Sequence, residues 1–338
     1  MRYSQTEKME VIRVVEESAM SVRQTLLMLG IKRSTFYKWY RRYAEDGFDG
    51  LEDRKPCPKK FWNRIPSPVK DQMVKIALEH PDKSPRELAW HITDSYGYYI
   101  SESSVYRILK SFDLITSPAY IVISAADTFK RPTKHVHELW QTDFSYFRIV
   151  GWGWYYLSTV MDDYSRYILA WKLSKTMMAD DVMETLDMAR EQTGIDQVQV
   201  QHRPRLLSDN GPCYLSRDLK EYLEERDMVH IRGARYHPQT QGKIERYHRS
   251  LKNVVNLQHY YLPGELEREL GHFVDHYNNH RYHESLDNLT PVDVYCGRRR
   301  ERLNVRDIIK RETMKLRRAF NQGKGGIKKH LLFGKSIL

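Results

Sequence analysis

Apolar residues recur at helical spacing in three short stretches of residues 5–46, which predicts three helices near the N-terminus. Gly30 is expected to close the second helix and Ser34 to cap the third, which is basic and aromatic. This order is typical of a helix-turn-helix unit, so residues 1–50 are predicted to bind DNA. A small helical bundle that binds protein is the alternative, and the basic third helix favours DNA. The expected DNA contacts are Arg33, Lys38, Arg41 and Arg42.

Helical spacing returns after a break in the pattern. Residues 51–66 hold three prolines and many charges, which predicts a linker. Residues 67–113 then repeat the helical plan, with a capping box at Ser84 and Glu87. We interpret this stretch as a second helix-turn-helix or winged-helix-like DNA-binding domain, followed by an irregular connector over residues 114–136. Its expected DNA contacts are Arg107 and Lys110.

The periodicity changes from helical to alternating at Leu139. An aromatic, alternating stretch is followed by a turn at residues 151–153 and by two more strand-like runs. Three hairpin-joined strands followed by strands that alternate with helices indicate a mixed α/β sheet. The later expected elements are helices over 178–192, 215–226 and 242–260 and strands over 205–208 and 229–231.

Three carboxylates fall where such a sheet would gather acidic side chains. Asp143 lies in the first strand, Asp209 directly follows a short strand, and Glu245 lies near the start of a helix, with 35 residues between Asp209 and Glu245. Hard cations such as Mg²⁺ take oxygen ligands, so converging carboxylates together with phosphate oxygens can complete their coordination. A single Asp on a strand is more often a structural or surface residue, so the surrounding sequence has to support the assignment.

Several motifs around these carboxylates supply that support. They are LWQTD at 139–143, SDNG at 208–211, HPQTQGKIER at 237–246, YNNHRYH at 277–283 and LTP at 289–291. Together they resemble the retroviral-integrase-like core of DDE transposases, and the last two resemble the end of that core in bacterial insertion-sequence transposases. The resemblance covers about residues 137–296; the zinc-binding His/Cys domain of retroviral integrases has no counterpart here.

The resemblance implies an RNase H-like fold, a mixed five-stranded sheet with flanking helices, preceded by all-α helix-turn-helix domains. It implies that Asp143, Asp209 and Glu245 are the catalytic residues and hold two Mg²⁺ (or Mn²⁺) ions. The implied protein is a transposase that binds the terminal inverted repeats of a mobile element and catalyses DNA cleavage and strand transfer. Its implied partners are double-stranded DNA of the element ends and target, and further copies of itself in a homo-oligomer.

The charge distribution agrees with this reading. Residues 137–296 have a net charge of −6, whereas residues 1–136 have +6 and residues 297–338 have +11. A basic surface is usually only a solvated one, but here DNA-binding patterns accompany it. The basic tail, 297–338, contains an amphipathic helix at roughly 303–320 that is expected to bind DNA nonspecifically, join a neighbouring subunit or form a disordered end.

Other polar and aromatic residues near the triad have competing interpretations. Arg249 and Lys252 share a helix face with Glu245 and are expected to touch phosphates, with an ordinary solvated face as the alternative. Asp162 and Asp163 are expected in a turn rather than as extra metal ligands. The aromatic residues Trp152, Trp154, Tyr155 and Tyr156 are expected in the sheet and core. The full set of contacts expected near the triad is Gln241, Lys243, Arg249 and Lys252.

Several classes of protein are disfavoured by the sequence. No apolar run is long enough for a membrane span, and the three separated cysteines match neither a disulfide framework nor a zinc site. His237 and His283 lack a second ligand pair at metal spacing. We therefore expect a cytoplasmic, nucleoid-associated protein. Two alternatives stay open: a transposase-derived DNA-binding regulator whose core has decayed, and a ribonuclease on the same fold.

Overall fold

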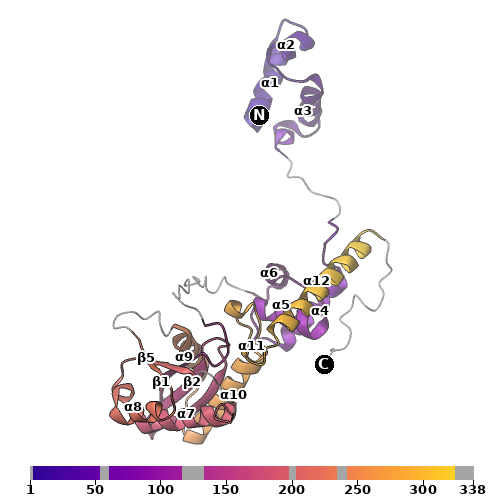
Figure 1. Cartoon of the computed structure of the whole chain (residues 1–338). Helices are drawn as coiled ribbons and strands as arrows, with labels where there is room; N and C mark the ends of the chain where they lie inside the picture. The colour runs from indigo at the N-terminus through magenta and orange to yellow at the C-terminus, as the bar shows by residue number, and fades with distance from the viewer. Residues whose placement is uncertain (1–2, 54–60, 116–132, 198–202, 234–241, 324–338) are drawn as a thin grey trace. The chain divides into compact units, whose positions relative to one another are not determined.

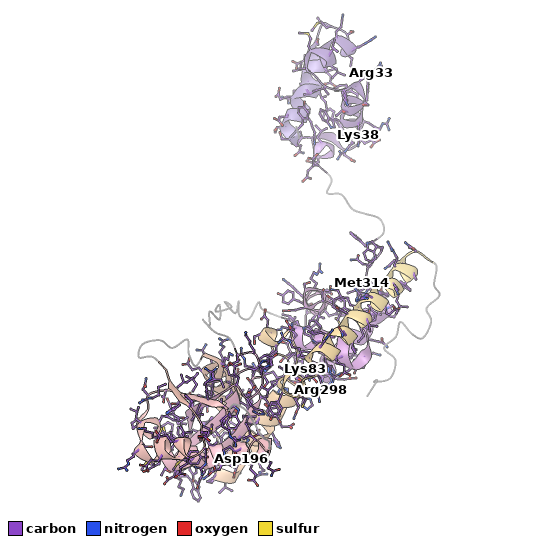
Figure 2. All side chains as sticks on the ribbon, in the orientation of Figure 1. Arg33, Lys38, Lys83, Asp196, Arg298 and Met314 are labelled. Carbon is purple, nitrogen blue, oxygen red and sulfur yellow. The ribbon has the colours of Figure 1, made fainter. Side chains whose placement is uncertain are left out.

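The computed structural model describes residues 3–53, 61–115, 133–197, 203–233 and 242–323. The chain divides into two compact units, Met1–Phe61 and Trp62–Leu338, each with cores of its own. Figure 1 labels their helices and strands, and Figure 2 adds the side chains. Among the helices that the structure describes, none combines the length and apolar character that spanning a membrane requires.

The first unit is the predicted group of three helices. They are α1 (Gln5–Glu17), α2 (Val22–Met28) and α3 (Arg33–Asp46), followed by a short 3₁₀ helix, Gly47–Leu51. Gly30 has a φ of 68°, a left-handed conformation that ends α2 as predicted. The predicted cap of α3 was wrong: Lys32 is the N-cap, and Ser34 lies within the first turn. The buried core includes Ile12, Leu26, Phe36 and Leu51.

The second unit begins with three further helices, α4 (Ser67–Glu79), α5 (Pro85–Tyr96) and α6 (Glu102–Ser111). The capping box is confirmed: Ser84 accepts a hydrogen bond from the Glu87 amide at 3.3 Å, and Glu87 accepts one from the Ser84 amide at 2.9 Å. The apolar faces of the three helices form one core, whose most buried members include Val69, Met73, Leu88, Ile92 and Val105.

The predicted mixed sheet is confirmed. It has five strands in the order β3-β2-β1-β4-β5. β2 is antiparallel to its neighbours β1 and β3, and β4 and β5 run parallel to β1. The strands are β1 (Leu139–Ile149), β2 (Gly153–Asp162), β3 (Ile168–Ser174), β4 (Arg205–Ser208) and β5 (His230–Arg232). This order and the flanking helices described below are those of the RNase H-like fold.

Helices cover both faces of the sheet (Figure 1). One face packs against α9 (Gly242–Val255) and α10 (Pro263–Asn279). The other packs against α7 (Ala179–Thr193) and α8 (Arg217–Glu224), the latter preceded by a 3₁₀ turn at Pro212–Leu215. The helix predicted to reach residue 260 is shorter, because the Tyr260 hydroxyl donates to the Val255 carbonyl and the Tyr260 carbonyl accepts from Val150.

The basic C-terminal region forms an ordered helix up to Asn321. A 3₁₀ turn (Glu284–Leu286) and α11 (Pro291–Tyr295) lead into α12 (Arg299–Asn321), which packs on α5 of the α4–α6 group. Arg306 donates two hydrogen bonds to Asp94, at 2.8 and 2.6 Å, and Arg317 donates to the Tyr98 hydroxyl. The predicted amphipathic helix is confirmed, and these two buried arginines make hydrogen bonds within the protein.

Candidate active site

The parallel pairing of β1 with β4 brings two of the three carboxylates together. The last pair in this register is Gln141 with Leu207, and Asp143 and Asp209 each lie two residues beyond that pair, Asp209 directly after the end of β4. Partial burial and the negative charge of Asp143 raise the pKa of Asp209, against a hydrogen bond from the Gly211 amide at 2.9 Å. The two carboxylates therefore interact electrostatically.

Asp143 is held by neighbours on two elements. Its Oδ1 accepts the Phe144 amide at 2.8 Å, and its Oδ2 lies 3.2 Å from Nδ1 of His248 on α9. The other ring nitrogen of His248 lies 3.4 Å from the Thr159 hydroxyl on β2. His248 is buried and fixed at both ends. The sequence indicated no such role, although its position three residues after Glu245 placed it on the same helix.

Glu245 lies in the first turn of α9, where its side chain is exposed. Asp143 and Glu245 line the same pocket, which has a volume of about 380 Å³. Asp209 is not among its lining residues. The other residues that line it are Phe144, Ser145, His248, Arg249, Lys252 and Asn253.

A buried polar network fixes the start of α9 against the sheet. The Lys243 ammonium is 2.6 Å from Oδ2 of Asp163, and both side chains are buried. The Gln141 amide donates to Oδ1 of Asp163 at 2.6 Å, while its carbonyl accepts the Ile244 amide at 3.2 Å. The predicted DNA contact by Lys243 was therefore wrong, because this ammonium is buried in an ion pair within the protein.

Asp162 has the predicted turn role. It accepts the Ser165 amide at 2.8 Å, the Ser165 hydroxyl at 2.6 Å and the His137 amide at 2.8 Å. Burial raises the pKa of Asp162, although these hydrogen bonds favour the ionised form. Asp163 also lies in this turn, as predicted, and its side chain joins the network with Lys243.

The remaining predicted DNA contacts occupy different kinds of position. Arg249 is exposed, and the Lys252 ammonium lies 4.0 Å from the centre of the Tyr146 ring. Arg42 is half-buried and donates to the Glu52 carbonyl at 2.7 Å, which leaves it less available than its neighbours. Gln241 lies outside the described residues. The exposed members of the set are Arg33 and Lys38 (labelled in Figure 2), Arg41, Arg107 and Lys110.

The aromatic residues of the β1–β2 hairpin were expected in the sheet and core, and two of them are exposed. Trp154 lies in the sheet but is exposed, and Trp152 is exposed and lies outside the strands. Tyr155 is buried, as expected, and Tyr156 is half-buried. Strand alternation explains the difference between Trp154 and Tyr155, because adjacent residues point to opposite faces of the sheet.

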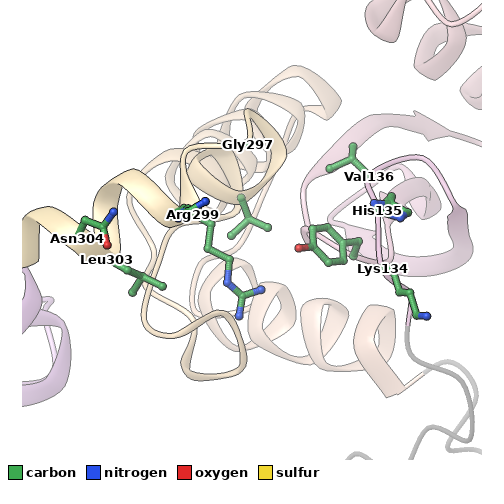
Figure 3. Close-up of a pocket in the computed structure, with 10 residues that line it drawn as sticks. Lys134, His135, Val136, Gly297, Arg299, Leu303 and Asn304 are labelled. Atoms are coloured by element: carbon green, nitrogen blue, oxygen red, sulfur yellow. The ribbon is translucent and has the colours of Figure 1, made fainter.

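A larger cavity lies elsewhere in this unit, at the start of α12 (Figure 3). It has a volume of about 540 Å³, and its walls include the basic side chains of Lys134, Arg299 and Arg300. Arg299 is already paired with Asp287. None of the three carboxylates lines this cavity, so the larger cavity is separate from the triad.

The chemistry of the triad fits a divalent cation. All three side chains offer carboxylate oxygens, the ligands that Mg²⁺ and Mn²⁺ prefer. The mutual repulsion of Asp143 and Asp209 is the kind of interaction that a bound cation relieves. Within the described ranges, however, no three His, Cys, Asp or Glu side chains are arranged to hold one metal ion together. The structure brings the carboxylates together in two pairs, Asp143 with Asp209 and Asp143 with Glu245.

Protein-family comparisons match both the N-terminal helical region and the region of the five-stranded sheet. Residues 133–238 and 226–291 each match an Integrase core domain family. Residues 2–52 and 35–109 each match a Homeodomain-like domain family.

Individual relatives include viral and bacterial proteins. The chain is 31% identical over 145 residues to the Gag-Pro-Pol polyprotein of mouse mammary tumor virus (strain BR6), covering 41% of the chain and 8% of the polyprotein. It is 25% identical over 194 residues to the transposase for insertion sequence element IS629 of Shigella sonnei, covering 55% of the chain and 62% of that transposase. The chain thus spans less than a tenth of the polyprotein and less than two thirds of the transposase.

Solved structures with a similar fold include two retroviral cores. One is the HTLV-2 integrase catalytic core domain in complex with magnesium (dimeric form), with 18% sequence identity and a TM-score of 0.37. The match covers 47% of this chain and 97% of that structure's chain. Another is the catalytic core domain of BIV integrase, with 22% sequence identity and a TM-score of 0.36. The match covers 49% of this chain and 99% of that structure's chain. The family matches confirm the predicted resemblance: the chain carries an integrase core domain, preceded by homeodomain-like helix-turn-helix domains.

Proposed function

We propose that this protein is a DDE-type DNA transposase, in which Asp143, Asp209 and Glu245 hold two Mg²⁺ or Mn²⁺ ions for DNA cleavage and strand transfer. The observation that carries the proposal is the pairing of these carboxylates across three elements of an integrase core. β1 carries Asp143, Asp209 directly follows β4, and α9 brings Glu245 to the pocket that Asp143 lines.

Each part of the pocket has a role in this proposal. When bound, the metal ions would activate a water or a DNA 3′-hydroxyl and stabilise charge on the leaving oxygen. His248 and the Phe144 amide hold the Asp143 carboxylate in one orientation. Arg249 and Lys252, which line the same pocket, would contact phosphates near the scissile bond. These interactions position the substrate and the carboxylates without any covalent link between protein and DNA.

Recognition of the element ends is assigned to the helical domains. The exposed Arg33, Lys38 and Arg41 on α3, and Arg107 and Lys110 on α6, would contact double-stranded DNA at the terminal inverted repeats. Because residues 137–296 have a net charge of −6, the basic flanks would supply most of the DNA affinity. Joining two DNA ends would require a homo-oligomer.

Two other functions use the same fold. A ribonuclease leaves the homeodomain-like domains without a purpose, and these domains favour a DNA substrate. A transposase-derived regulator would have no need of the three carboxylates, all of which are present. The observations therefore favour an enzyme that acts on DNA.

The direct test is a strand-transfer assay with the purified chain and DNA from the flanks of its own gene. We expect joined products with Mg²⁺ or Mn²⁺ and none in EDTA. End binding without joined products in either metal would favour the regulator. Cleavage of RNA–DNA hybrids without strand transfer would favour the ribonuclease.

A further inference from the structure

Three large aromatic side chains lie exposed on one hairpin of the integrase core. Tyr146 is 56% exposed, Trp152 51% and Trp154 53%, and we call them the hairpin aromatic patch. The rings of Tyr146 and Trp154 are 5.6 Å apart at 75° to each other. Leaving such rings in water is unfavourable, and contiguous exposed apolar surface of this kind marks an interaction site.

The register of the sheet explains why two of these rings share a face. Tyr146 pairs with Tyr156, and Arg148 pairs with Trp154, in the antiparallel β1–β2 ladder. Residues opposite each other in such a ladder point to the same side. This face therefore carries the rings of Tyr146, Trp154 and Tyr156 and the guanidinium of Arg148. The arrangement follows from strand alternation and persists whenever the hairpin is folded.

Cations accompany the patch. The Lys252 ammonium lies 4.0 Å from the centre of the Tyr146 ring, and the Lys175 ammonium lies 5.5 Å from that of Trp152. Exposed rings alternating with ammonium groups are typical of proteins that bind single-stranded nucleic acid, in which bases stack on the rings and phosphates meet the cations. A hydrophobic protein partner would match the rings and leave these charges unpaired.

The patch is continuous with the candidate active site. Lys252 contacts Tyr146 and also lines the pocket that contains Asp143 and Glu245. Tyr146 lies three residues from Asp143 along β1, roughly 10 Å, and strand alternation turns the two side chains to opposite faces, so Lys252 is the residue that joins the patch to the pocket. A strand that lies over the patch can therefore continue into the pocket.

From these observations we infer that the hairpin aromatic patch binds unpaired nucleotides of a DNA strand that enters or leaves the active site. The bases must be unpaired because a duplex keeps their faces stacked on one another. This inference rests on the proposed function for the identity of the nucleic acid. It goes beyond that function by assigning Tyr146, Trp152 and Trp154 to the single-stranded part of the substrate.

The test measures binding by the full chain in EDTA, where no cleavage is possible. The probes are a labelled oligo-dT of about 15 nucleotides and a blunt duplex of the same length, each read by fluorescence anisotropy. Trp154→Leu and Tyr146→Leu should each weaken oligo-dT binding by about fivefold or more, with duplex binding changed by less than about twofold. Trp154→Phe should restore most of the oligo-dT affinity.

Trp62→Leu is the matched control. Trp62 is 49% exposed and has the Arg318 guanidinium 5.4 Å from its ring, but it does not belong to the hairpin. The inference is overturned if the hairpin variants leave oligo-dT binding unchanged or weaken both probes equally. It is also overturned if they abolish self-association in sedimentation without affecting oligo-dT. Because the assay needs no catalysis, a chain inactive in strand transfer could still pass it, which separates the two proposals.

Discussion

Lys243 and Asp163 form an ion pair at 2.6 Å, with side chains only 8% and 4% exposed, although the two residues are 80 positions apart in the sequence. The pair joins the first turn of α9 to the end of β2, and Gln141 extends it to β1. The helix that carries Glu245 is thereby fixed against the strand that carries Asp143. Lys243 contributes to the geometry of the site from inside the protein.

Lys243→Met should destabilise the protein by roughly 3–5 kcal/mol, because it leaves Asp163 buried without its cation. Lys243→Met combined with Asp163→Asn should recover at least half of that loss, since both charges are then removed. Urea unfolding measures both variants. A loss below about 1 kcal/mol for Lys243→Met, together with weaker DNA binding, would instead support the DNA contact first predicted.

His248→Ala should raise the Mn²⁺ concentration required for DNA cleavage by about 10- to 100-fold, because the partner that orients the Asp143 carboxylate is lost. A Mn²⁺ titration of the cleavage rate provides the measurement. Asn253→Ala is the control, since Asn253 lines the same pocket from an exposed position. If both variants titrate like the parent protein, His248 does not orient Asp143.

Arg306→Ala should release α12 from the α4–α6 helices. Arg306 is buried, donates two hydrogen bonds to Asp94 and lies 4.4 Å from the centre of the Trp90 ring, so its loss removes these contacts and leaves the half-buried Asp94 carboxylate without its cation. Limited trypsin digestion should then cut within α12 at protease concentrations that spare the parent protein. Arg311→Ala removes an exposed arginine of the same helix and should leave the digestion pattern of the remaining sites unchanged. Equal resistance of Arg306→Ala and the parent would contradict this anchoring role.

Stability should fall as the pH drops below about 6.5. Burial, and then the charge of Arg281, lower the pKa of His283 from 6.5 to about 3. The unfolded chain binds this proton near pH 6.5 and the folded chain only near pH 3. The contribution of His283 to stability is therefore fully present above pH 6.5 and is lost as the pH falls toward 3. Between these values the protein loses about 1.4 kcal/mol per pH unit from this group.

His283→Phe should flatten that slope, because Phe keeps a ring against Tyr277 and cannot titrate. Urea unfolding at a series of pH values between about 5 and 7 measures it. His272→Gln, at a side chain that is 77% exposed, is the control and should keep the parent slope. An unchanged slope in His283→Phe would show that other groups set the pH dependence.

The sequence predicted most of the fold because alternation and helical spacing are local properties. The positions of the strands, the capping box at Ser84 and the turn at Asp162 all follow from neighbouring residues. The end of α9 did not, because it depends on Tyr260 reaching back to the β1–β2 turn. The N-cap at Lys32 was also missed, since no side chain bonds the first turn of α3 and the usual capping residue is absent.

Roles in the site were predicted less completely, because they depend on contacts between distant segments. The position of Lys243 two residues before Glu245 suggested a contact with DNA, whereas its actual partner, Asp163, lies on another element. Trp154 was expected in the core, although only the register of β1 with β2 decides which face it occupies. The pairing of Asp143 with Asp209 likewise depends on which strands are neighbours.

We propose that Asp143, Asp209 and Glu245 act as one metal-dependent catalytic centre. Strand transfer of the protein's own DNA ends, with Mg²⁺ or Mn²⁺, compares Asp143→Asn, Asp209→Asn and Glu245→Gln with the parent protein. We predict that each variant loses both cleavage and joining, while binding to the same ends, measured without metal, changes by less than about twofold. Full strand transfer by any one of the three variants would show that these carboxylates do not form the catalytic centre.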